Sequence, residues 1–306
     1  MGTPEFAVPS LEMLIKEGYH VIAAVTQPDK PKGRGNKFCA PPVKEIAIEH
    51  GIDVLQPSKI KTPEFVEQIR ALGPDLLVTA AYGKILSKEL LEVPTLGCIN
   101  VHGSLLPAYR GAAPINWAII NGEKITGITT MFTDVGLDTG DMLLSSELNI
   151  DDNITAGELN DKMAVLGAEV LKNTLTQLVN GSLERKPQIE ALSSYAPLMS
   201  KELGLIEWTK TAQQVHNLVR GTAPWPGAYT YLNGNRMRIW RTSLVPYMES
   251  KLADGEIAQV DREGILVKCS DTFILIKEIQ FDSSKRMSVS DYIRGHQIDV
   301  GEKLGK

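Results

Sequence analysis

The sequence predicts two domains: an α/β domain built on a mostly parallel sheet, and a smaller β-barrel or β-sandwich domain after it. Three observations predict this. The chain has 306 residues, which is too many for one ordinary compact core and too few for three. Up to about residue 180, β-branched runs alternate with helical patterns, which indicates crossover connections on a mostly parallel sheet. Beyond residue 204, short strand-like runs are separated by turn residues.

The elements of the first domain follow from hydrophobic periodicity and from proline and glycine punctuation. Strands are expected at residues 21–26, 53–55, 76–80, 97–102, 127–133 and 142–148. Helices are expected at residues 9–17, 42–50, 63–72, 88–91 and 113–121. A long amphipathic helix is expected at 155–180, because its apolar residues recur at intervals of three and four: Leu159, Met163, Leu166, Val170, Leu171, Leu175 and Leu178.

The stretch after this helix is polar, contains Pro187 and Pro197 and shows little periodicity, which is typical of a linker lying against the first domain. The second domain opens with a helix at 212–220. Its strands are expected at 228–232, 236–244, 255–261, 264–269 and 273–281. We therefore expect a first domain at 1–181, a linker at 182–203 and a second domain at 204–306.

The first residues bear on the sheet itself. In a doubly wound sheet, a glycine turn such as Gly2-Thr3-Pro4 usually follows a strand and opens a helix, and here Met1 begins inside that turn. Either the fold has no strand at this place, or a few apolar residues precede Met1. We expect the second, because a missing interior strand leaves unpaired backbone groups and a cavity.

Composition narrows the class of protein. Hydrophobic residues make up 43% of the chain and charged residues 23%, and no apolar run approaches the roughly 18 residues of a membrane span. The start lacks the pattern of a secretion signal, so we expect a cytoplasmic protein without a membrane partner. The three cysteines, Cys39, Cys98 and Cys269, lack CxxC spacing, which argues against a disulfide framework and against a zinc site.

Charge is distributed unevenly along the chain. Residues 1–203 carry 18 basic against 25 acidic side chains, and residues 204–306 carry 14 against 12. The second domain is therefore weakly positive. Ordinary scatter of surface charge explains this imbalance as well as a polyanionic partner does.

Asn100 and His102 form the first candidate constellation. Side chains alternate along a strand, so the two project on the same face at the end of the strand expected at 97–102. The carboxyl ends of strands border the ligand crevice in open α/β sheets. A structural alternative remains open, in which Asn100 caps a turn and His102 is a core histidine with satisfied hydrogen bonds.

The segment "DVGLDTGDML", residues 134–143, adds carboxylates to this pair. Two glycines and three acids between strands suit a tight loop near the strand ends, although Asp134 or Asp141 could serve only as turn formers or caps. An amide donor, an imidazole and a carboxylate together suit acyl transfer. Neither G-x-S-x-G nor an activated cysteine motif occurs, so the attacking group is expected to come from the substrate. Dinucleotide and Walker motifs are also absent from the sequence.

A basic loop lies near the start of the chain. The stretch "QPDKPKGRGNK", residues 27–37, interleaves Lys30, Lys32, Arg34 and Lys37 with proline and glycine. Such a mobile loop suits phosphate contacts, and a merely solvated loop is the alternative.

Three segments together resemble the methionyl-tRNA formyltransferases of bacteria and organelles: "GCINVHGSLLPAYRGAAPINWAI", "GLDTGDML", and "GTPEFAVPSLEML" with "VTQPDKPKGRG". The similarity extends to "APWPGAYT" in the second domain. The resemblance implies a Rossmann-like domain with a mostly parallel sheet and the folate pocket, followed by an OB-like β-barrel that contributes to tRNA binding. This sequence differs from such proteins at its start, where they usually have a short apolar strand before the residues that match Met1 to Pro4.

The resemblance also implies the roles of individual residues. Asn100, His102 and Asp138 match the catalytic trio, and Ser104, Leu105, Leu106 and Pro107 match the lining of the folate site. The loop that holds Lys30, Lys32, Arg34 and Lys37 matches the tRNA contact. The implied reaction transfers the formyl group of 10-formyltetrahydrofolate to the α-amino group of methionyl initiator tRNA, for translation initiation. Neither a metal nor an obligate protein partner is implied, and a monomer is expected.

Two other classes of function stay open. A related enzyme could use the same formyl donor with glycinamide ribonucleotide, a nucleotide-sugar amine or water as the acceptor, since the trio does not discriminate among them. The basic loop and the second domain argue against those acceptors. A catalytically dead RNA-binding protein could keep both features, and the intact trio argues against it.

Overall fold

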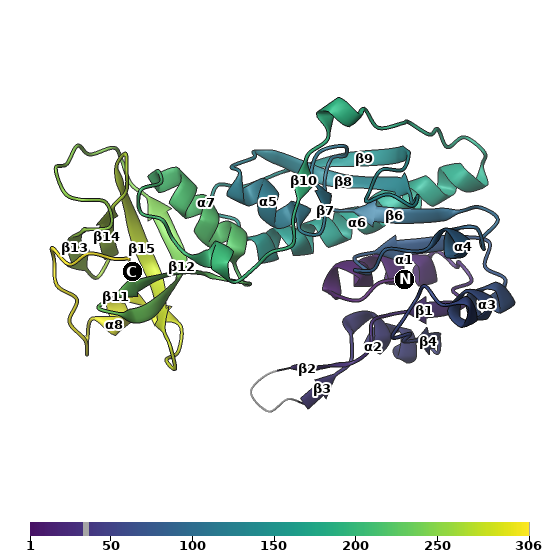
Figure 1. Cartoon of the computed structure of the whole chain (residues 1–306), viewed down its shortest axis with the longest axis horizontal. Helices are drawn as coiled ribbons and strands as arrows, with labels where there is room; N and C mark the ends of the chain where they lie inside the picture. Colours follow the sequence, from purple (N-terminus) through teal and green to yellow (C-terminus); the bar gives the residue numbers. More distant parts are fainter. Residues whose placement is uncertain (33–36, 306) are drawn as a thin grey trace. The chain divides into compact units, whose positions relative to one another are not determined.

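The computed structural model describes residues 1–32 and 37–305 (Figure 1). The chain falls into two compact units, each assembled from separate segments. The first comprises Met1–Pro114, Ile125–Asn149 and Asn160–Pro197, and the second comprises Ile115–Lys124, Ile150–Leu159 and Leu198–Lys306. Within the described part of the chain, none of the helices combines the length and the apolar character that a membrane crossing requires.

The sheet of the first unit holds most of its strands where the sequence predicts them. β5 (Leu77–Ala80) pairs in parallel with β6 (Cys98–His102), and the antiparallel strands β8 (Ile125–Phe132) and β9 (Met142–Asn149) extend the sheet beyond β6. β1 (Ala23–Val25) and β4 (Asp53–Leu55) form a separate parallel pair. Between β1 and β5 lies the start of the chain, where Gly2 N donates to Val25 O and Ala80 N donates to Met1 O, both at 3.0 Å.

The α-helices of this part of the chain also match the expected ranges within about two residues. They are α1 (Val8–Lys16), α2 (Pro42–Glu49), α3 (Pro63–Leu72), α4 (Lys88–Leu91), α5 (Pro114–Ile120) and α6 (Ala156–Val179). A short 3-10 helix, η1 (Glu5–Ala7), precedes α1 and was not expected. Local chemistry explains α3: Thr62 Oγ1 accepts from Phe65 N, Pro63 opens the first turn, and Gly73 ends the helix in the left-handed region. Its apolar face, Phe65, Val66 and Ile69, packs in one core with Leu77 and Cys98 of the sheet.

Two regions expected to lack regular structure contain short strands. β2 (Lys30–Lys32) and β3 (Lys37–Cys39) form an antiparallel hairpin at the base of the basic loop (Figure 1). In the expected linker, β10 (Tyr195–Ala196) pairs with β7 (Arg110–Gly111), and η2 (Glu190–Leu192) precedes β10. Residues 182–197 thus lie within the first unit.

The second unit is a β-sheet domain, as the sequence predicts. Its antiparallel sheet has the order β11-β12-β15-β14-β13, with β16 paired to β15. The strands are β11 (Ala228–Leu232), β12 (Asn235–Leu244), β13 (Ile257–Asp261), β14 (Gly264–Lys268), β15 (Phe273–Phe281) and β16 (Met287–Ser288), and the helices are η3 (Glu202–Gly204), α7 (Ala212–Thr222) and α8 (Val289–Tyr292). Alternate residues such as Met237 and Ile239 are fully buried in one apolar cluster with Ile265 and Ile276.

Candidate active site

Asn100 lies on β6, an interior strand of its sheet, and its side chain is half-buried. Thr79, its register partner on β5, donates from Oγ1 to Asn100 Oδ1 at 2.8 Å. The amide oxygen is therefore already hydrogen-bonded to a residue of the neighbouring strand. No hydrogen bond of the amide nitrogen is found among the described residues, so its two protons remain available to a ligand.

His102, at the end of β6, is only 5% exposed and lies between two acceptors. Its Nε2 is 3.0 Å from the carbonyl oxygen of Tyr109, and its Nδ1 is 3.7 Å from Asp138 Oδ2. A carbonyl can only accept, so Nε2 carries a proton. The other ring nitrogen, Nδ1, faces the Asp138 carboxylate. The structure thus brings His102 and Asp138 together, although they belong to separate segments.

Asp138 is held in place by hydrogen bonds from two residues outside its loop. Its φ is +54°, a left-handed conformation that Asp tolerates. Its Oδ2 accepts from Gly111 N at 2.9 Å, and its carbonyl accepts from Gln188 Nε2 at 2.8 Å. Asp134, in contrast, accepts from Gly136 N and from Thr139 Oγ1 within the loop. Of these two acids, Asp134 therefore shapes the loop and Asp138 faces the histidine.

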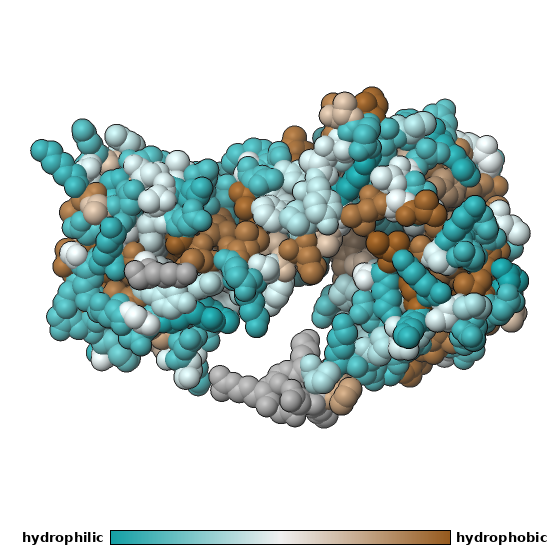
Figure 2. Space-filling view, viewed as in Figure 1, coloured by the Kyte–Doolittle hydropathy of each residue, from teal (hydrophilic) through white to brown (hydrophobic). Residues whose placement is uncertain are grey.

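Arg110 ties the segment after α6 to this loop. This buried guanidinium donates from Nε to Gln188 Oε1 at 3.0 Å and from Nη1 to Glu190 Oε2 at 2.8 Å. The hydrogen bond from Arg110 is the largest cause that lowers the pKa of the Glu190 carboxyl. Ile189, just before the turn η2, and Leu192, at its end, are exposed apolar side chains, and Figure 2 shows hydrophobic side chains there at the top of the view.

Three of these supporting residues escape sequence reasoning: Thr79, Arg110 and Gln188. Thr79 is identified only by the strand register, and Gln188 lies in the stretch expected to be a linker. Arg110 lies inside the motif "LLPAYRG", which is the one signal that could have found it.

The residues Ser104 to Pro107 follow His102 directly and form a pinned loop. Ser104 Oγ donates to Ala108 O at 2.6 Å, and Leu106 N donates to Thr129 Oγ1 at 3.1 Å. Ser104 and Leu106 are buried, whereas Leu105 and Pro107 keep part of their surface accessible. Leu105 and Pro107 can therefore offer apolar contacts to a ligand, while the Ser104 hydroxyl holds the turn.

The basic loop is described only in part. Lys30 is exposed and donates from Nζ to Gln27 Oε1 at 3.0 Å. The backbones of Lys32 and Lys37 pair across the hairpin, but their side chains, and Arg34 as a whole, lie outside the described residues. No contact joins Lys30 to His102 in the part of the chain that the structure describes.

Within the described residues, neither the two buried cysteines nor a cluster of metal-ligating side chains forms a second centre. Burial raises the pKa of the Cys98 thiol, and burial with nearby Asp271 raises that of Cys269 to about 12, so neither forms a thiolate readily. In residues 1–32 and 37–305, no cluster of three or more His, Cys, Asp or Glu side chains could hold a metal ion. The donors Asn100 and His102 on β6, with Asp138 beside His102, suit stabilisation of charge on a carbonyl oxygen and transfer of a proton.

Comparisons with known proteins cover both units. Residues 1–175 match the family model described as formyl transferase, and residues 198–297 match the one described as formyl transferase, C-terminal domain. The chain is 74% identical over 307 residues to the methionyl-tRNA formyltransferase of Ruminiclostridium cellulolyticum, an alignment that covers 100% of this chain and 98% of the relative. It is 61% identical over 306 residues to the methionyl-tRNA formyltransferase of Acetivibrio thermocellus, with the same coverage of each chain.

A solved structure shows the same fold at low identity. The sugar 3N-formyl transferase WlaRD, crystallised with dTDP and 5-N-formyl-THF, superposes with a TM-score of 0.68. The match is 20% identical and covers 93% of this chain and 97% of WlaRD. At this identity the likeness concerns the fold alone.

Proposed function

The chain belongs to the formyl transferase family, and from this we propose that it transfers the formyl group of 10-formyltetrahydrofolate to the α-amino group of methionyl initiator tRNA. The observation that carries the proposal is the full-length relationship, 74% identical, to a methionyl-tRNA formyltransferase. Both units are included in that relationship. The full-length relationship supports tRNA as the acceptor, and the side chains at the end of β6 support the formyl-transfer chemistry.

We assign the formyl oxygen to two donors at the end of β6. The folate co-substrate supplies an activated formyl group, which the amine of methionine attacks. Negative charge then develops on the formyl oxygen. The amide protons of Asn100 and the Nε2 proton of His102 stabilise this charge, and each such donor is typically worth about 3 kcal/mol of barrier. In the structure, Nε2 donates to the Tyr109 carbonyl oxygen, so the formyl oxygen has to displace that acceptor.

Asp138 has two roles in this proposal. Its carboxylate, 3.7 Å from Nδ1, stabilises a protonated His102 ring. It also accepts the proton that the amine loses on forming the new C–N bond, through one water molecule. The proton count closes when the departing folate nitrogen takes up a proton in place of its formyl group. Gly111 N and Gln188 keep the loop positioned during these steps.

The folate donor fits the pinned loop after His102. Leu105 and Pro107 offer apolar surface beside the trio, and the contacts of Ser104 and Leu106 keep the loop in one conformation. We assign these four residues to the wall of the folate site. The proposed steps place no metal at the formyl group.

The tRNA contact is assigned to the basic hairpin. Lys30, Lys32 and Lys37 supply ammonium groups and Arg34 supplies a guanidinium that can bind phosphate in a bidentate manner. The weakly positive second domain adds backbone contacts. Affinity for tRNA then falls as the salt concentration rises, because phosphate contacts release counterions. We further propose that the protein acts in the cytoplasm as a monomer without an obligate protein partner.

One assay tests the proposal. The purified chain is incubated with 10-formyltetrahydrofolate and methionyl initiator tRNA, and formyl-methionine on the tRNA is measured. Glycinamide ribonucleotide and a nucleotide-sugar amine serve as parallel acceptors. Product from tRNA alone supports the proposal. Product only from a small amine overturns the acceptor, and binding of tRNA without any product identifies an RNA-binding protein without catalysis.

A further inference from the structure

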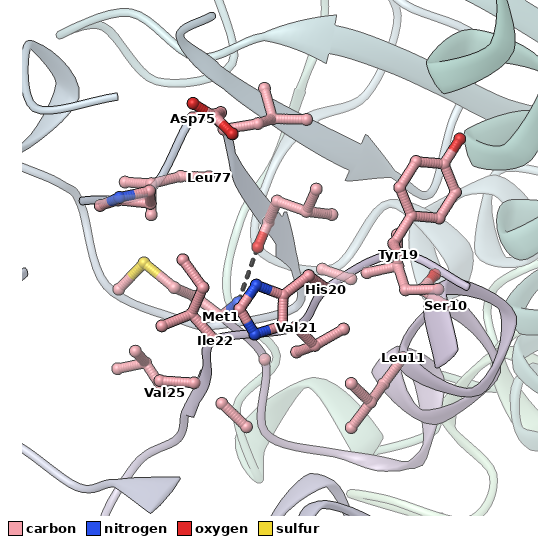
Figure 3. Close-up of a pocket in the computed structure, with 18 of the residues that line it drawn as sticks. Met1, Ser10, Leu11, Tyr19, His20, Val21, Ile22, Val25, Asp75 and Leu77 are labelled. Atoms are coloured by element: carbon pink, nitrogen blue, oxygen red, sulfur yellow. Dashed lines mark hydrogen bonds between the residues drawn. The ribbon is translucent and has the colours of Figure 1, made fainter. Parts of the chain in front are cut away.

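A cavity of about 390 Å³ between β1 and β5 is separate from the candidate active site. Figure 3 shows Tyr19, His20 and Asp75 around it, and most of its other lining residues are aliphatic. The residues that line it include no member of the catalytic trio and none of the residues 104–107. A substrate that reacts at His102 therefore needs contact surface outside this cavity.

Tyr195 provides exposed aromatic surface beside the candidate active site. It lies on β10, which pairs in parallel with β7 (Figure 1), and 61% of the residue is exposed. A Cβ atom on Gly111 of β7 would lie 2.6 Å from Cε2 of the Tyr195 ring, so one edge of the ring rests on this glycine. The rest of the side chain stays accessible to a ligand.

Two hydrogen-bonded connections join this ring to the catalytic trio. Gly111 N donates to Asp138 Oδ2 at 2.9 Å, and the same oxygen is 3.7 Å from His102 Nδ1. Just before β10, Ser194 Oγ accepts from Tyr109 N at 2.8 Å, and the carbonyl of Tyr109 accepts from His102 Nε2. The position of the ring is therefore fixed relative to the two residues.

The acceptor of the proposed function brings an unpaired base to the same place. In an aminoacyl-tRNA the amino acid is esterified to the ribose of the terminal adenosine, so only the ester and the sugar separate the reacting amine from the adenine base. In the proposed function Asp138 accepts the proton of this amine, so the amine approaches on the side of Asp138 and Gly111. The adenine of the same nucleoside then comes within reach of the Tyr195 ring.

The surface around the ring favours a neutral aromatic group over a phosphate. Arg110, the register partner of Tyr195, is buried, and its guanidinium is already bonded to two side chains of the segment before β10. On that segment, Ile189 and Leu192 are exposed and apolar. A nucleic-acid base stacks on an aromatic side chain through its uncharged face.

We propose that the Tyr195 ring is the stacking platform for the adenine base at the 3′ end of the acceptor tRNA. This inference rests on the proposed function, because the acceptor is taken from there. Stacking on one aromatic side chain typically changes affinity about 5- to 150-fold per base. The stacked base holds the terminal nucleoside, and the ester on its ribose then presents the amine to the formyl group.

The test measures binding of the trinucleotide CCA and of a matched probe in which the terminal adenosine has lost its base. NMR titrations give the Kd of both probes for the unchanged chain and for Tyr195→Phe, Tyr195→Ala and Tyr247→Ala. Tyr247 is the matched control, because it is also exposed, at 73%, and lies in the second unit. Neither probe carries an amino acid, so the measurement does not depend on formyl transfer.

The stacking platform predicts that the unchanged chain and Tyr195→Phe bind CCA about tenfold more tightly than the abasic probe. Tyr195→Ala binds the two probes about equally, and Tyr247→Ala behaves like the unchanged chain. Equal affinity of the unchanged chain for the two probes overturns the proposal, and this comparison does not depend on the folding of any variant. A preference for CCA that persists in Tyr195→Ala also overturns it, since another group then binds the base.

A folate titration tests the other aromatic ligand that could lie on this ring. The Kd of 5-formyltetrahydrofolate should be the same for the unchanged chain and for Tyr195→Ala. A larger Kd in Tyr195→Ala for the folate, but not for CCA, overturns the proposal, because the ring then stacks on the folate. Failure of the proposed function is a separate result: a chain that stacks CCA on Tyr195 but forms no formyl-methionine has the platform without the reaction.

Discussion

Thr79 Oγ1 donates a 2.8 Å hydrogen bond to Asn100 Oδ1, across a register pair of the parallel strands β5 and β6. An amide side chain has two nearly equivalent orientations, and this bond selects the one in which the oxygen faces β5. The amide nitrogen is then directed away from Thr79. Thr79 is thus a positioning residue for the donor that we assign to the formyl oxygen.

Removing this hydroxyl without changing side-chain volume isolates that role. We expect Thr79→Val to lower kcat about tenfold, with little change in KM, because the amide loses its preferred orientation. Thr79→Ser keeps the hydroxyl and restores most of kcat. Steady-state kinetics and Tm of both variants provide the measurement. A kcat unchanged in Thr79→Val excludes the positioning role.

In our proposal, His102 acts in the chemistry and Arg34 in tRNA binding, so variants of the two residues should affect different steps. We expect His102→Ala to reduce kcat at least about 100-fold, because it removes a donor to the formyl oxygen. Its affinity for tRNA stays nearly unchanged. Arg34→Ala does most of its damage to tRNA affinity, and its loss grows smaller at high salt. Single-turnover rates and tRNA titrations test both variants. A His102→Ala enzyme with near-normal rates contradicts the assignment.

Gly111 connects the loop of Asp138 to the rest of the first unit. Its N–H donates to the Asp138 carboxylate, and its φ of +112° is one that side-chain-bearing residues rarely adopt. A Cβ here would lie 2.6 Å from the Tyr195 ring and 2.7 Å from Ala196 O. We expect Gly111→Ala to destabilise the fold by about 2 to 4 kcal/mol, from strain plus steric overlap.

Gly51→Ala is the matched control for this change. Gly51 also has a positive φ, +67°, but nothing lies within 4 Å of a Cβ placed there. We expect it to cost only about 1 kcal/mol, from backbone strain alone. Urea unfolding of both variants gives the difference. Equal losses in the two variants show that the contacts of Gly111 with Tyr195 and Ala196 contribute nothing.

Local chemistry explains why many elements could be predicted from the sequence. The helix α3 has its expected bounds because Thr62, Pro63 and Gly73 define its ends. The pairing of Asn100 and His102 on one face follows from strand alternation alone. The hairpin β2–β3 could not be predicted, since lysine, proline and glycine are depleted in strands.

Long-range contacts explain what the sequence leaves out. Thr79 meets Asn100 only through the parallel register, and Gln188 reaches the carbonyl of Asp138 from a segment without periodicity. No local pattern encodes such distant pairings. Similarly, Ile115–Lys124 and Ile150–Leu159 belong to the second unit although they lie within the first domain in sequence. Their membership depends on tertiary contacts that propensity and periodicity do not report.

Two buried bases make the stability of the chain depend on pH. Burial lowers the pKa of the Met1 amine from 8.0 to about 6. Burial also lowers the pKa of His216, whose Nδ1 is hydrogen-bonded to Thr242 Oγ1 and whose Nε2 is hydrogen-bonded to Asp152 O. In both cases the unfolded chain binds more protons, so stability rises with pH. The Met1 contribution is complete above pH 8 and falls by about 2 kcal/mol as the pH drops to about 6. The His216 contribution is complete above about pH 6.5 and is lost below it.

We expect Tm, measured from pH 9 to pH 5, to fall in both ranges. Acetylation of Met1 should flatten only the upper range, and His216→Gln only the lower one. A Tm that stays constant between pH 8 and pH 6 in the unmodified chain contradicts the burial of a neutral amine at Met1.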